Sequence, residues 1–236
     1  MSSTVSSVQS LNRPLRRDET LPVALLLGFA GGYLDAYTWI THGVLANAQT
    51  TNLVFLWVNA AAARWQEALH FAPPLFAFGV GVVIASWLRR AVGEQAGRLT
   101  LLTEIAMLIF VGMLHNRVPA VAGTLGISLV AAMQTSIFTR VEGANYSSVM
   151  ITGNFRQAIE GAFALASRDP QAGLLRKSSL YMAVCATFGT GAAAGALTTE
   201  RWPAFTLIVP ALALALVLLL CGTPRRTHDP TEQMSR

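Results

Sequence analysis

Six apolar runs, each close to the length of a membrane-spanning helix, constrain this chain more than any other feature of its sequence. A helix that crosses the hydrocarbon core of a bilayer needs about 17–25 largely apolar residues. Only 12% of the residues are charged, whereas soluble domains carry about 25%. The chain is therefore predicted to be an all-α integral membrane protein. The expected spans are Leu21–Ile40, Phe71–Leu88, Leu99–Leu114, Val118–Thr139, Ser179–Thr199 and Pro203–Cys221.

Two further apolar segments, Asn52–Ala63 and Asn154–Leu165, are too short to cross, because each gives about 18 Å of helix against a core of about 30 Å. The positive-inside rule tests this. If neither segment crosses and the N-terminus is cytoplasmic, 14 of the 17 Lys and Arg residues lie inside and the other 3 outside. If both cross, the split is 11 to 5, with Arg156 left in the membrane. The charges favour six spans and two short re-entrant or interfacial helices.

With six spans the chain divides into two halves of three. Because three is an odd number, the halves are inserted in opposite orientations, as in the inverted repeats of transporters and channels. The predicted fold is thus six transmembrane helices in two inverted three-helix repeats, each with a short re-entrant or interfacial helix. The expected boundaries are a disordered arm at 1–19, a first repeat at 20–116, a second repeat at 117–222 and a tail at 223–236.

A polar pattern recurs in the two halves. Asp35 is followed by a Gly-containing link and the triplet Thr50-Thr51-Asn52, and Gln134 is followed by a similar link and Thr152-Gly153-Asn154. The triplets are placed as helix N-caps, whose side-chain oxygens satisfy backbone N–H groups that would otherwise face hydrocarbon. The same helix N-termini carry partial positive charge and can hold an anion or a carboxylate.

These paired patterns resemble the YoaK-like family of bacterial membrane proteins, a domain-of-unknown-function family. The matching residues are Leu34-Asp35-Ala36 with Asn47-Ala48-Gln49-Thr50-Thr51-Asn52, and Met133-Gln134 with Thr152-Gly153-Asn154. This chain has Thr51 where the family has Gly. The resemblance covers about residues 20–221 and implies an architecture, with no established activity. It places the chain in the bacterial cytoplasmic (inner) membrane as a multi-pass protein in contact with lipid, and the charges place both termini in the cytoplasm.

Asp35 and Gln134 lie about two thirds along oppositely directed spans, on opposite sides of the expected midplane. A carboxylate at that depth costs a few kcal/mol unless it is paired, protonated or wetted. Two interpretations stay open. The residues line a solute pathway, with Asp35 able to gain or lose a proton, or they are interhelical hydrogen-bond clamps worth about 0.6–2 kcal/mol.

Other polar and small residues carry narrower expectations. Arg156 either pairs with Glu160 or reaches Asp35 as a counter-ion. Glu104, early in the third span near Arg98, is expected to be solvated. Two small-xxx-small pairs predict close helix packing or dimerisation: Gly28 with Gly32, and Gly191 with Gly195.

The sequence predicts a transporter or channel for a small polar or anionic solute, with a midplane site where two opposed half-helix N-termini meet. The alternative is a membrane scaffold or regulatory protein without transport. Singly scattered histidines, with no phosphate-binding glycine loop and no nucleophile–base arrangement, predict no enzyme activity, cofactor or metal. Scattered basic residues exclude a nucleic-acid partner, and a homodimer stays open. The candidate pathway residues are Asp35, Asn47, Gln49, Thr50, Asn52, Gln134, Thr152, Gly153, Asn154 and Arg156.

Overall fold

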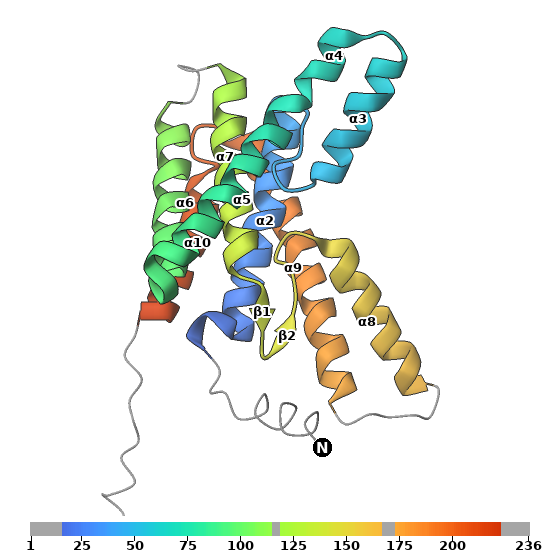
Figure 1. Ribbon diagram of the computed structural model, residues 1–236, viewed down its shortest axis with the longest axis vertical. Helices are drawn as coiled ribbons and strands as arrows, with labels where there is room; N and C mark the ends of the chain where they lie inside the picture. The colour runs from blue at the N-terminus through green and yellow to red at the C-terminus, as the bar shows by residue number, and fades with distance from the viewer. Residues whose placement is uncertain (1–15, 115–118, 167–172, 223–236) are drawn as a thin grey trace, which may run out of the picture.

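A computed structural model describes residues 16–114, 119–166 and 173–222 (Figure 1). Of the predicted terminal segments, residues 1–15 and 223–236 lie outside the described part. The described helices run in the order η2 Arg17–Glu19, α2 Leu21–His42, α3 Gln49–Ala61, α4 Trp65–His70, α5 Ala72–Val92, η3 Gly93–Gln95, α6 Ala96–Met113, α7 Ala120–Ile137, α8 Ile151–Ala166, α9 Leu174–Arg201 and α10 Ile208–Gly222. Two short strands, β1 Arg140–Val141 and β2 Ala144–Asn145, form an antiparallel hairpin between α7 and α8.

Three described helical stretches are long and apolar enough to cross a membrane: Leu21–His42, Trp65–Met113 and Leu174–Arg201. The second stretch contains α5 and α6, which turn back on each other at Gly93, where φ is +54° (Figure 1). Two shorter apolar helices, Val121–Ile137 and Ile208–Gly222, complete the bundle. Many large apolar side chains are exposed on its surface, among them Trp57, Phe76, Trp87, Phe110 and Leu219. The architecture is compatible with the predicted all-α membrane protein.

Local sequence explains where several helices begin and end. Pro22 lies in the first turn of α2, and Pro73 and Pro74 lie in the first turn of α5, where a missing backbone N–H costs nothing. Pro119 is the N-cap residue of α7. At the other end of α2, Gly43 has φ +66° and donates its N–H to the carbonyl of Trp39, which closes the helix with a left-handed residue.

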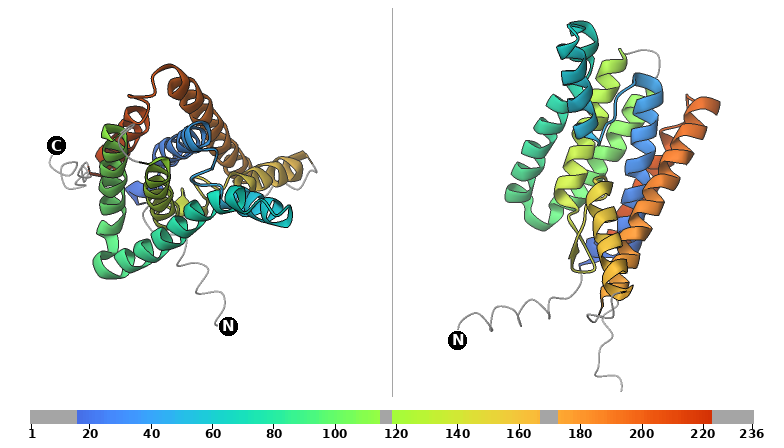
Figure 2. Two further views of the ribbon diagram at one scale, coloured as in Figure 1. Left: turned by 90° about the horizontal axis from the view of Figure 1, so that it is seen from above. Right: turned by 90° about the vertical axis from the view of Figure 1, so that its right-hand side faces the viewer.

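Helix α2 lies in the middle of the bundle, and its partners come from distant parts of the chain (Figure 2). It packs mainly on α9 and also on α10, whereas α7 packs mainly on α5 and also on α6. At the α2–α9 interface, a Cβ on Gly191 would overlap the carbonyl oxygen of Phe29, and one on Gly32 would overlap that of Phe188. The predicted small-residue faces therefore pack against each other within one chain.

The same close approach occurs between α5 and α7. A Cβ on Gly81 would overlap the carbonyl oxygen of Leu129. Backbones that approach this closely need a residue without a side chain at the crossing point. Both main helix pairs of the bundle thus cross at glycines, α2 and α9 at Gly32 and Gly191, and α5 and α7 at Gly81.

The two ends of the bundle differ in charge. At one end lie η2, the η3 turn, the β1–β2 hairpin and the start of α9; α4 and the end of α9 lie at the other (Figure 1). We call the first the arginine-rich end, because these elements and their flanks carry Arg16, Arg17, Arg89, Arg90, Arg98, Arg140, Arg176 and Lys177. The elements of the α4 end carry Arg64 and Arg201.

The sequence predicted only a polar link between the fourth span and the second short helix, and this was incomplete. The link contains the β1–β2 hairpin, whose two-residue turn places Glu142 at φ 46° and Gly143 at φ 80°. The backbone N–H of Glu142 donates to the carbonyl of Glu19 at 2.6 Å, and its carboxylate forms an ion pair with the guanidinium of Arg176 at 2.8 Å. The hairpin thereby fastens η2 and α9 together at the arginine-rich end. Helix α4 was likewise not predicted.

Candidate functional site

The first connection, residues 43–48 between α2 and α3, is hydrogen-bonded to α2 along its length. The backbone N–H of Asn47 donates to Oδ1 of Asp35 at 2.7 Å, and its side-chain Nδ2 donates to the carbonyl of Gly31 at 3.0 Å. The N–H of Ala46 donates to Oγ1 of Thr38 at 3.1 Å. Asp35 is only 6% exposed, so its carboxylate serves here as an acceptor for backbone of the connection.

Asn52 continues this arrangement from inside α3. Its Oδ1 accepts the N–H of Leu45 at 3.2 Å, and its Nδ2 donates to the carbonyl of the same residue at 2.6 Å. Gln49 adds a bond from Nε2 to the carbonyl of Ala46 at 2.6 Å, and its Oε1 accepts from Asn52 at 3.0 Å. The Asn52 side chain thus satisfies both the N–H and the carbonyl of Leu45, which lies outside any helix.

The second connection, residues 138–150 between α7 and α8, is held in the same manner. Oδ1 of Asn154 accepts the N–H of Ser147 at 3.3 Å, and its Nδ2 donates to the carbonyl of Ser147 at 2.6 Å. Each asparagine therefore binds a residue that lies 7 positions earlier in the sequence. The hydroxyl of Ser147 bonds to that of Thr135 on α7 at 3.0 Å.

The expectation that the two triplets act as N-caps was wrong. Helix α3 begins at Gln49 with Ala48 as its N-cap residue, which makes no side-chain cap bond, and α8 begins at Ile151. Asn52 and Asn154 are therefore the fourth residues of their helices. Their side chains fold back along the first turn and bind the preceding connection, because the helices start three residues earlier than the triplet pattern suggested.

The two connections meet at Gly31 on α2. Its carbonyl accepts from Asn47 of the first connection, and a Cβ on it would lie 2.7 Å from Cγ1 of Val149 and 3.5 Å from the carbonyl oxygen of Ser148 in the second. From this meeting point α3 runs toward the α4 end and α8 toward the arginine-rich end (Figure 1). The starts of two oppositely directed short helices are thus placed around one residue of the central helix.

Glu104 on α6 was expected to be solvated, and this was wrong. Its side chain is fully buried at 0% exposure and faces the amide of Gln134 on α7, which is 1% exposed. One orientation of this amide gives hydrogen-bond partners to both its nitrogen and its oxygen, and the opposite one places the amide oxygen against the carboxyl oxygens, which requires a proton on Glu104. With its nitrogen toward Glu104, the amide donates to the two carboxyl oxygens at 2.9 and 3.1 Å and accepts from Oγ of Ser148 at 2.9 Å.

The opposite orientation of the same amide makes different bonds. Nε2 then donates to Oγ of Ser148 at 2.9 Å and to the carbonyl of Leu27 at 3.4 Å, and the amide oxygen faces Glu104. The sequence predicted the depth of Glu104 along its helix but not the direction in which its side chain points. A signal was present in the i, i+4, i+7 spacing of Gly97, Leu101 and Glu104, which lie on one helix face.

Four of the predicted pathway residues do not join this centre. Thr50, Thr152, Gly153 and Arg156 are exposed, and a Cβ on Gly153 would meet nothing within 4 Å. Nη1 of Arg156 pairs with Oε1 of Glu160 at 3.8 Å on the surface of α8, which is one of the two partners expected for it. The buried centre consists instead of Asp35, Asn47, Asn52, Gln134 and Asn154, with Gln49 half-buried and with Glu104 and Ser148 added by the structure.

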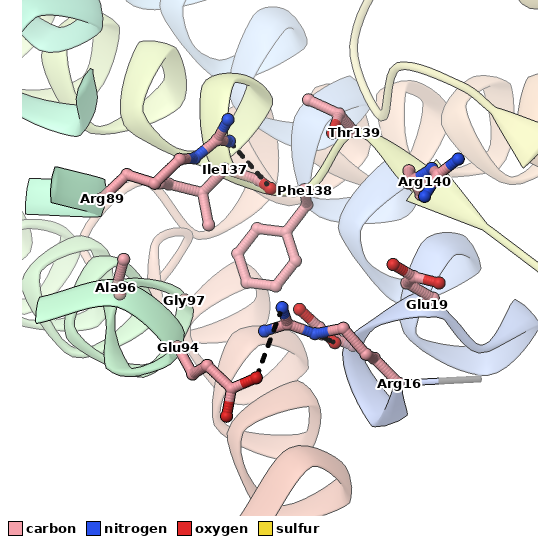
Figure 3. Close-up of a pocket in the computed structure, with 12 residues that line it drawn as sticks. Arg16, Glu19, Arg89, Glu94, Ala96, Gly97, Ile137, Phe138, Thr139 and Arg140 are labelled. Carbon is pink, nitrogen blue, oxygen red and sulfur yellow. Dashed lines mark hydrogen bonds and ion pairs between the residues drawn. The ribbon is translucent and has the colours of Figure 1, made fainter. Parts of the chain in front are cut away.

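Two adjoining cavities open at the arginine-rich end, and together we call them the vestibule. Their volumes are about 460 and 550 Å³, and they share Arg16, Asp18, Glu94, Gly97 and Phe138. Figure 3 shows the guanidinium groups of Arg16 and Arg89 on opposite sides of the Phe138 ring. No pattern in the sequence predicted this vestibule, because its walls come from the segment around η2, from α5, η3, α6 and α10, and from the segment after α7.

Charged and apolar groups have separate places in the vestibule. Arg16 pairs with Asp18 at 3.2 Å and with Glu94 at 3.8 Å, while Arg89 donates to the carbonyls of Ser136 and Ile137 at the end of α7. The inner wall is apolar. Phe138 is 3% exposed and packs beside Gly97, and the fully buried Leu101 lines the second cavity three residues before Glu104.

Metal binding has no visible basis in the described residues. Within 16–114, 119–166 and 173–222, no group of three or more His, Cys, Asp or Glu side chains is placed to hold an ion.

Comparison with known proteins places the chain in a family. Residues 23–220 match the model of a family described as a protein of unknown function (DUF1275). No curated protein and no solved structure matches the chain. The match spans the whole bundle from α2 to α10, including both connections. The chain therefore belongs to the DUF1275 family of proteins of unknown function.

Proposed function

We propose that this protein is a six-span inner-membrane transporter or channel for a small anionic solute, built from two inverted three-span repeats of YoaK-like architecture. The observation that carries the proposal is the pair of matching connections. Asn52 and Asn154 hold the starts of two short helices by the same two bonds, and these starts meet at Gly31 while the helices run toward opposite ends.

The packing of the bundle supports two repeats. In the first, α2, α3, α5 and α6 correspond to α7, α8, α9 and α10 of the second. The first helix of each repeat packs on the last two long helices of the other, so that α2 contacts α9 and α10, and α7 contacts α5 and α6. The glycine crossings correspond as well, because Gly81 faces the carbonyl of Leu129 and Gly191 faces that of Phe29.

Short helices that start near the midplane support a solute site. In secondary transporters, discontinuous helices of two inverted repeats point their N-termini at anionic groups of the substrate. Here the bonds of Asp35, Asn47, Asn52 and Asn154 fix the backbone of both helix starts. In the proposal these side chains position the site, and the dipoles at the N-termini of α3 and α8 supply its positive partial charge.

The vestibule supports an anionic solute and an orientation. It is lined by five arginines and three carboxylates, and a mouth of net positive charge raises the local concentration of anions. These residues are Arg16, Arg17, Arg89, Arg98 and Arg140, with Asp18, Glu19 and Glu94. In the proposal this end faces the cytoplasm, as the positive-inside rule predicts for the end with more arginines.

A scaffold or regulatory role is the second candidate, and one observation favours it. The side chains of Asp35, Asn52 and Asn154 are all bonded to backbone groups of their own repeat, as interhelical and loop clamps would be. In this role the polar centre would only stabilise the bundle.

Currents from proteoliposomes on a solid-supported membrane separate the two candidates. Sodium nitrate, formate, acetate, lactate and phosphate are applied as concentration jumps, with protein-free liposomes as the blank. A transporter or channel gives a current with at least one anion. The triple variant Arg16→Gln, Arg89→Gln, Arg98→Gln should lower it several-fold.

The matched control is Arg64→Gln with Arg201→Gln at the α4 end, which leaves the vestibule intact and should retain most of the current. Folded protein that gives no current with any of the five anions contradicts transport of small anions and favours the scaffold.

A further inference from the structure

The strongest unexplained feature of the bundle is the buried pair of Glu104 and Gln134. Neither side chain contributes to the two connections in the way that Asp35 or the asparagines do. Glu104 is fully buried, and the hydrogen-bond donor that its carboxyl finds among the described residues is the amide of Gln134, at 2.9 and 3.1 Å. A carboxyl buried without a cation costs several kcal/mol in its ionised form, so its presence requires a reason.

The second repeat shows that packing is not the reason. The crossings of Gly81 and Gly191 align α5–α6 with α9–α10, and the carbonyls of Leu129 and Phe29 align α7 with α2. In this register Glu104 corresponds to Leu214 and Gln134 to Leu34. Both leucines are buried, at 0% and 1% exposure, in one apolar cluster. Two leucines therefore fill the equivalent place in a fold of the same geometry.

The hydrogen bonds of Gln134 depend on whether Glu104 carries a proton. An ionised Glu104 only accepts, so it needs the amide nitrogen, and Ser148 then donates to the amide oxygen. A protonated Glu104 can donate to the amide oxygen, and Nε2 then donates to Ser148 and to the carbonyl of Leu27. Gain or loss of one proton reverses the direction of the bond to Ser148, which lies in the second connection.

We propose that Glu104 is a proton-binding site that exchanges with the vestibule, and that the amide of Gln134 passes its protonation state to Ser148 at the start of the second short helix. A proton that enters from the vestibule binds the carboxylate of Glu104, the amide turns, and the hydroxyl of Ser148 changes from donor to acceptor. Release of the proton to the same side reverses each step.

The residues between Glu104 and the vestibule fit a proton route. Thr100 lies one helical turn nearer the vestibule on the same face of α6, and its buried Oγ1 has no hydrogen-bond partner in the described part of the chain. Leu101, the next residue of α6, and Phe138 both line the second cavity of the vestibule. A hydroxyl without a fixed partner can both accept and donate a proton-carrying bond.

The other titratable groups on the surrounding elements lie away from the pair or are already bonded. Helix α7 carries no titratable residue, and α10 carries only Cys221 at its end. Helix α2, which Gln134 touches at Leu27, carries Asp35, which is bonded to Asn47, and Tyr33, which is bonded to Thr206. Its Tyr37 and His42 lie further along the helix toward the α4 end. The charged groups of α5, η3 and α6 other than Glu104 lie near the turn at the arginine-rich end, where Arg89, Glu94 and Arg98 line the vestibule and Arg90 follows Arg89 in the sequence. Glu104 is therefore the titratable group whose protonation sets the orientation of the Gln134 amide.

This inference rests on the proposed function for its purpose, since a proton switch at a helix start serves coupled transport, but its test does not require a solute. Dicyclohexylcarbodiimide reacts with protonated carboxyls in apolar surroundings. Purified protein in liposomes is treated at values from about pH 5 to about pH 9, the range in which buried carboxyls titrate, and the modified peptide is quantified by mass spectrometry. We expect modification at Glu104 that falls as the pH rises.

Four variants sharpen this test. Glu104→Gln should abolish modification of that peptide, and Glu67→Gln, at an exposed carboxyl, should leave it unchanged. Gln134→Leu removes the donor to the ionised carboxyl, so the pH of half-modification should rise by about 1 unit. The double variant Glu104→Leu, Gln134→Leu copies the leucine pair of the second repeat and should fold with wild-type or higher thermal stability.

Two results would overturn the proposal. The first is an absence of modification at Glu104 over the whole pH range in folded protein, which would mean a permanently ionised residue. The second is equal modification at every pH, with an infrared carboxyl band that does not move in heavy water, which would mean a structural acid that never exchanges. Either result leaves the anion currents, and so the proposed function, to be judged on their own.

Discussion

Asn52 and Asn154 occupy the same place in two short helices and make the same two hydrogen bonds. Each is the fourth residue of its helix, and each binds both the N–H and the carbonyl of a residue in the preceding connection, Leu45 in one case and Ser147 in the other. A buried backbone N–H or carbonyl in hydrocarbon costs several kcal/mol when unpaired. The two asparagines are therefore what allows each chain segment to break its helix inside the bundle.

Asn52→Ala and Asn154→Ala should each destabilise the protein by about 1–3 kcal/mol, because each leaves a backbone N–H and a carbonyl without partners. The measurement is the unfolding midpoint of purified protein in detergent. The exposed neighbours provide matched controls, so Thr50→Ala and Thr152→Ala should change stability by less than about 0.5 kcal/mol. Equal midpoints for the asparagine and threonine variants would contradict this role.

Gly191→Ala and Gly81→Ala should each cost about 1–3 kcal/mol, because the new Cβ overlaps a backbone carbonyl that cannot move without separating two helices. Each site has a control two residues earlier on the same helix. Gly189→Ala and Gly79→Ala place a Cβ where nothing lies within 4 Å, and should be neutral or stabilising. Thermal unfolding of the four variants in one detergent compares them directly. A similar loss in all four would show that helix flexibility, not close packing, is measured.

Gly153→Ala should be neutral or stabilise the protein by about 0.4–1 kcal/mol. The residue lies within α8, its φ is not positive, and a Cβ there meets open space, so the main effect is a smaller conformational entropy of the unfolded chain. The corresponding position of α3, its third residue, already carries Thr51. Strong destabilisation in thermal unfolding would mean that the glycine is needed for an approach that the structure does not contain.

Asp35→Asn distinguishes the two interpretations of Asp35, as a charged group of a solute pathway or as a hydrogen-bond clamp. An asparagine Oδ1 can still accept from the N–H of Asn47, so the variant should fold with a loss of about 1 kcal/mol or less. Asp35→Leu removes the acceptor and should cost about 1–3 kcal/mol. If the charge of Asp35 acts in a pathway, the anion current of Asp35→Asn changes several-fold in protein of near-normal stability. A current equal to that of wild type assigns Asp35 to the clamp.

Cysteine accessibility tests the orientation. After Cys185→Ala and Cys221→Ala, a single Gln66→Cys on α4 should react with an impermeant maleimide in intact cells. Gln95→Cys, in the η3 turn at the arginine-rich end, should react only after the cells are opened, because arginine-rich connections stay in the cytoplasm. Both side chains are exposed in the structure. Labelling of Gln95→Cys from outside would invert the proposed topology.

The sequence alone determined the features that depend on length, composition and spacing along one helix. Apolar runs of spanning length predicted the long helices, and segments too short to cross predicted α3 and α8. The small-residue pairs, such as Gly191 with Gly195, predicted a face of close packing. These are local properties, because the geometry of a helix repeats every few residues and follows from residues that are close together in the sequence.

Tertiary structure alone decided which polar groups meet. The partner of Asn52 is backbone of a connection whose path no side-chain pattern encodes, and the exposure of Glu104 depends on how α6 is rotated against α7. The vestibule joins Arg16, Arg89 and Arg140 from three distant segments. A hydrogen bond or a cavity wall requires positions within a few ångströms in space. Sequence fixes such positions only through the packing of every helix that lies between them.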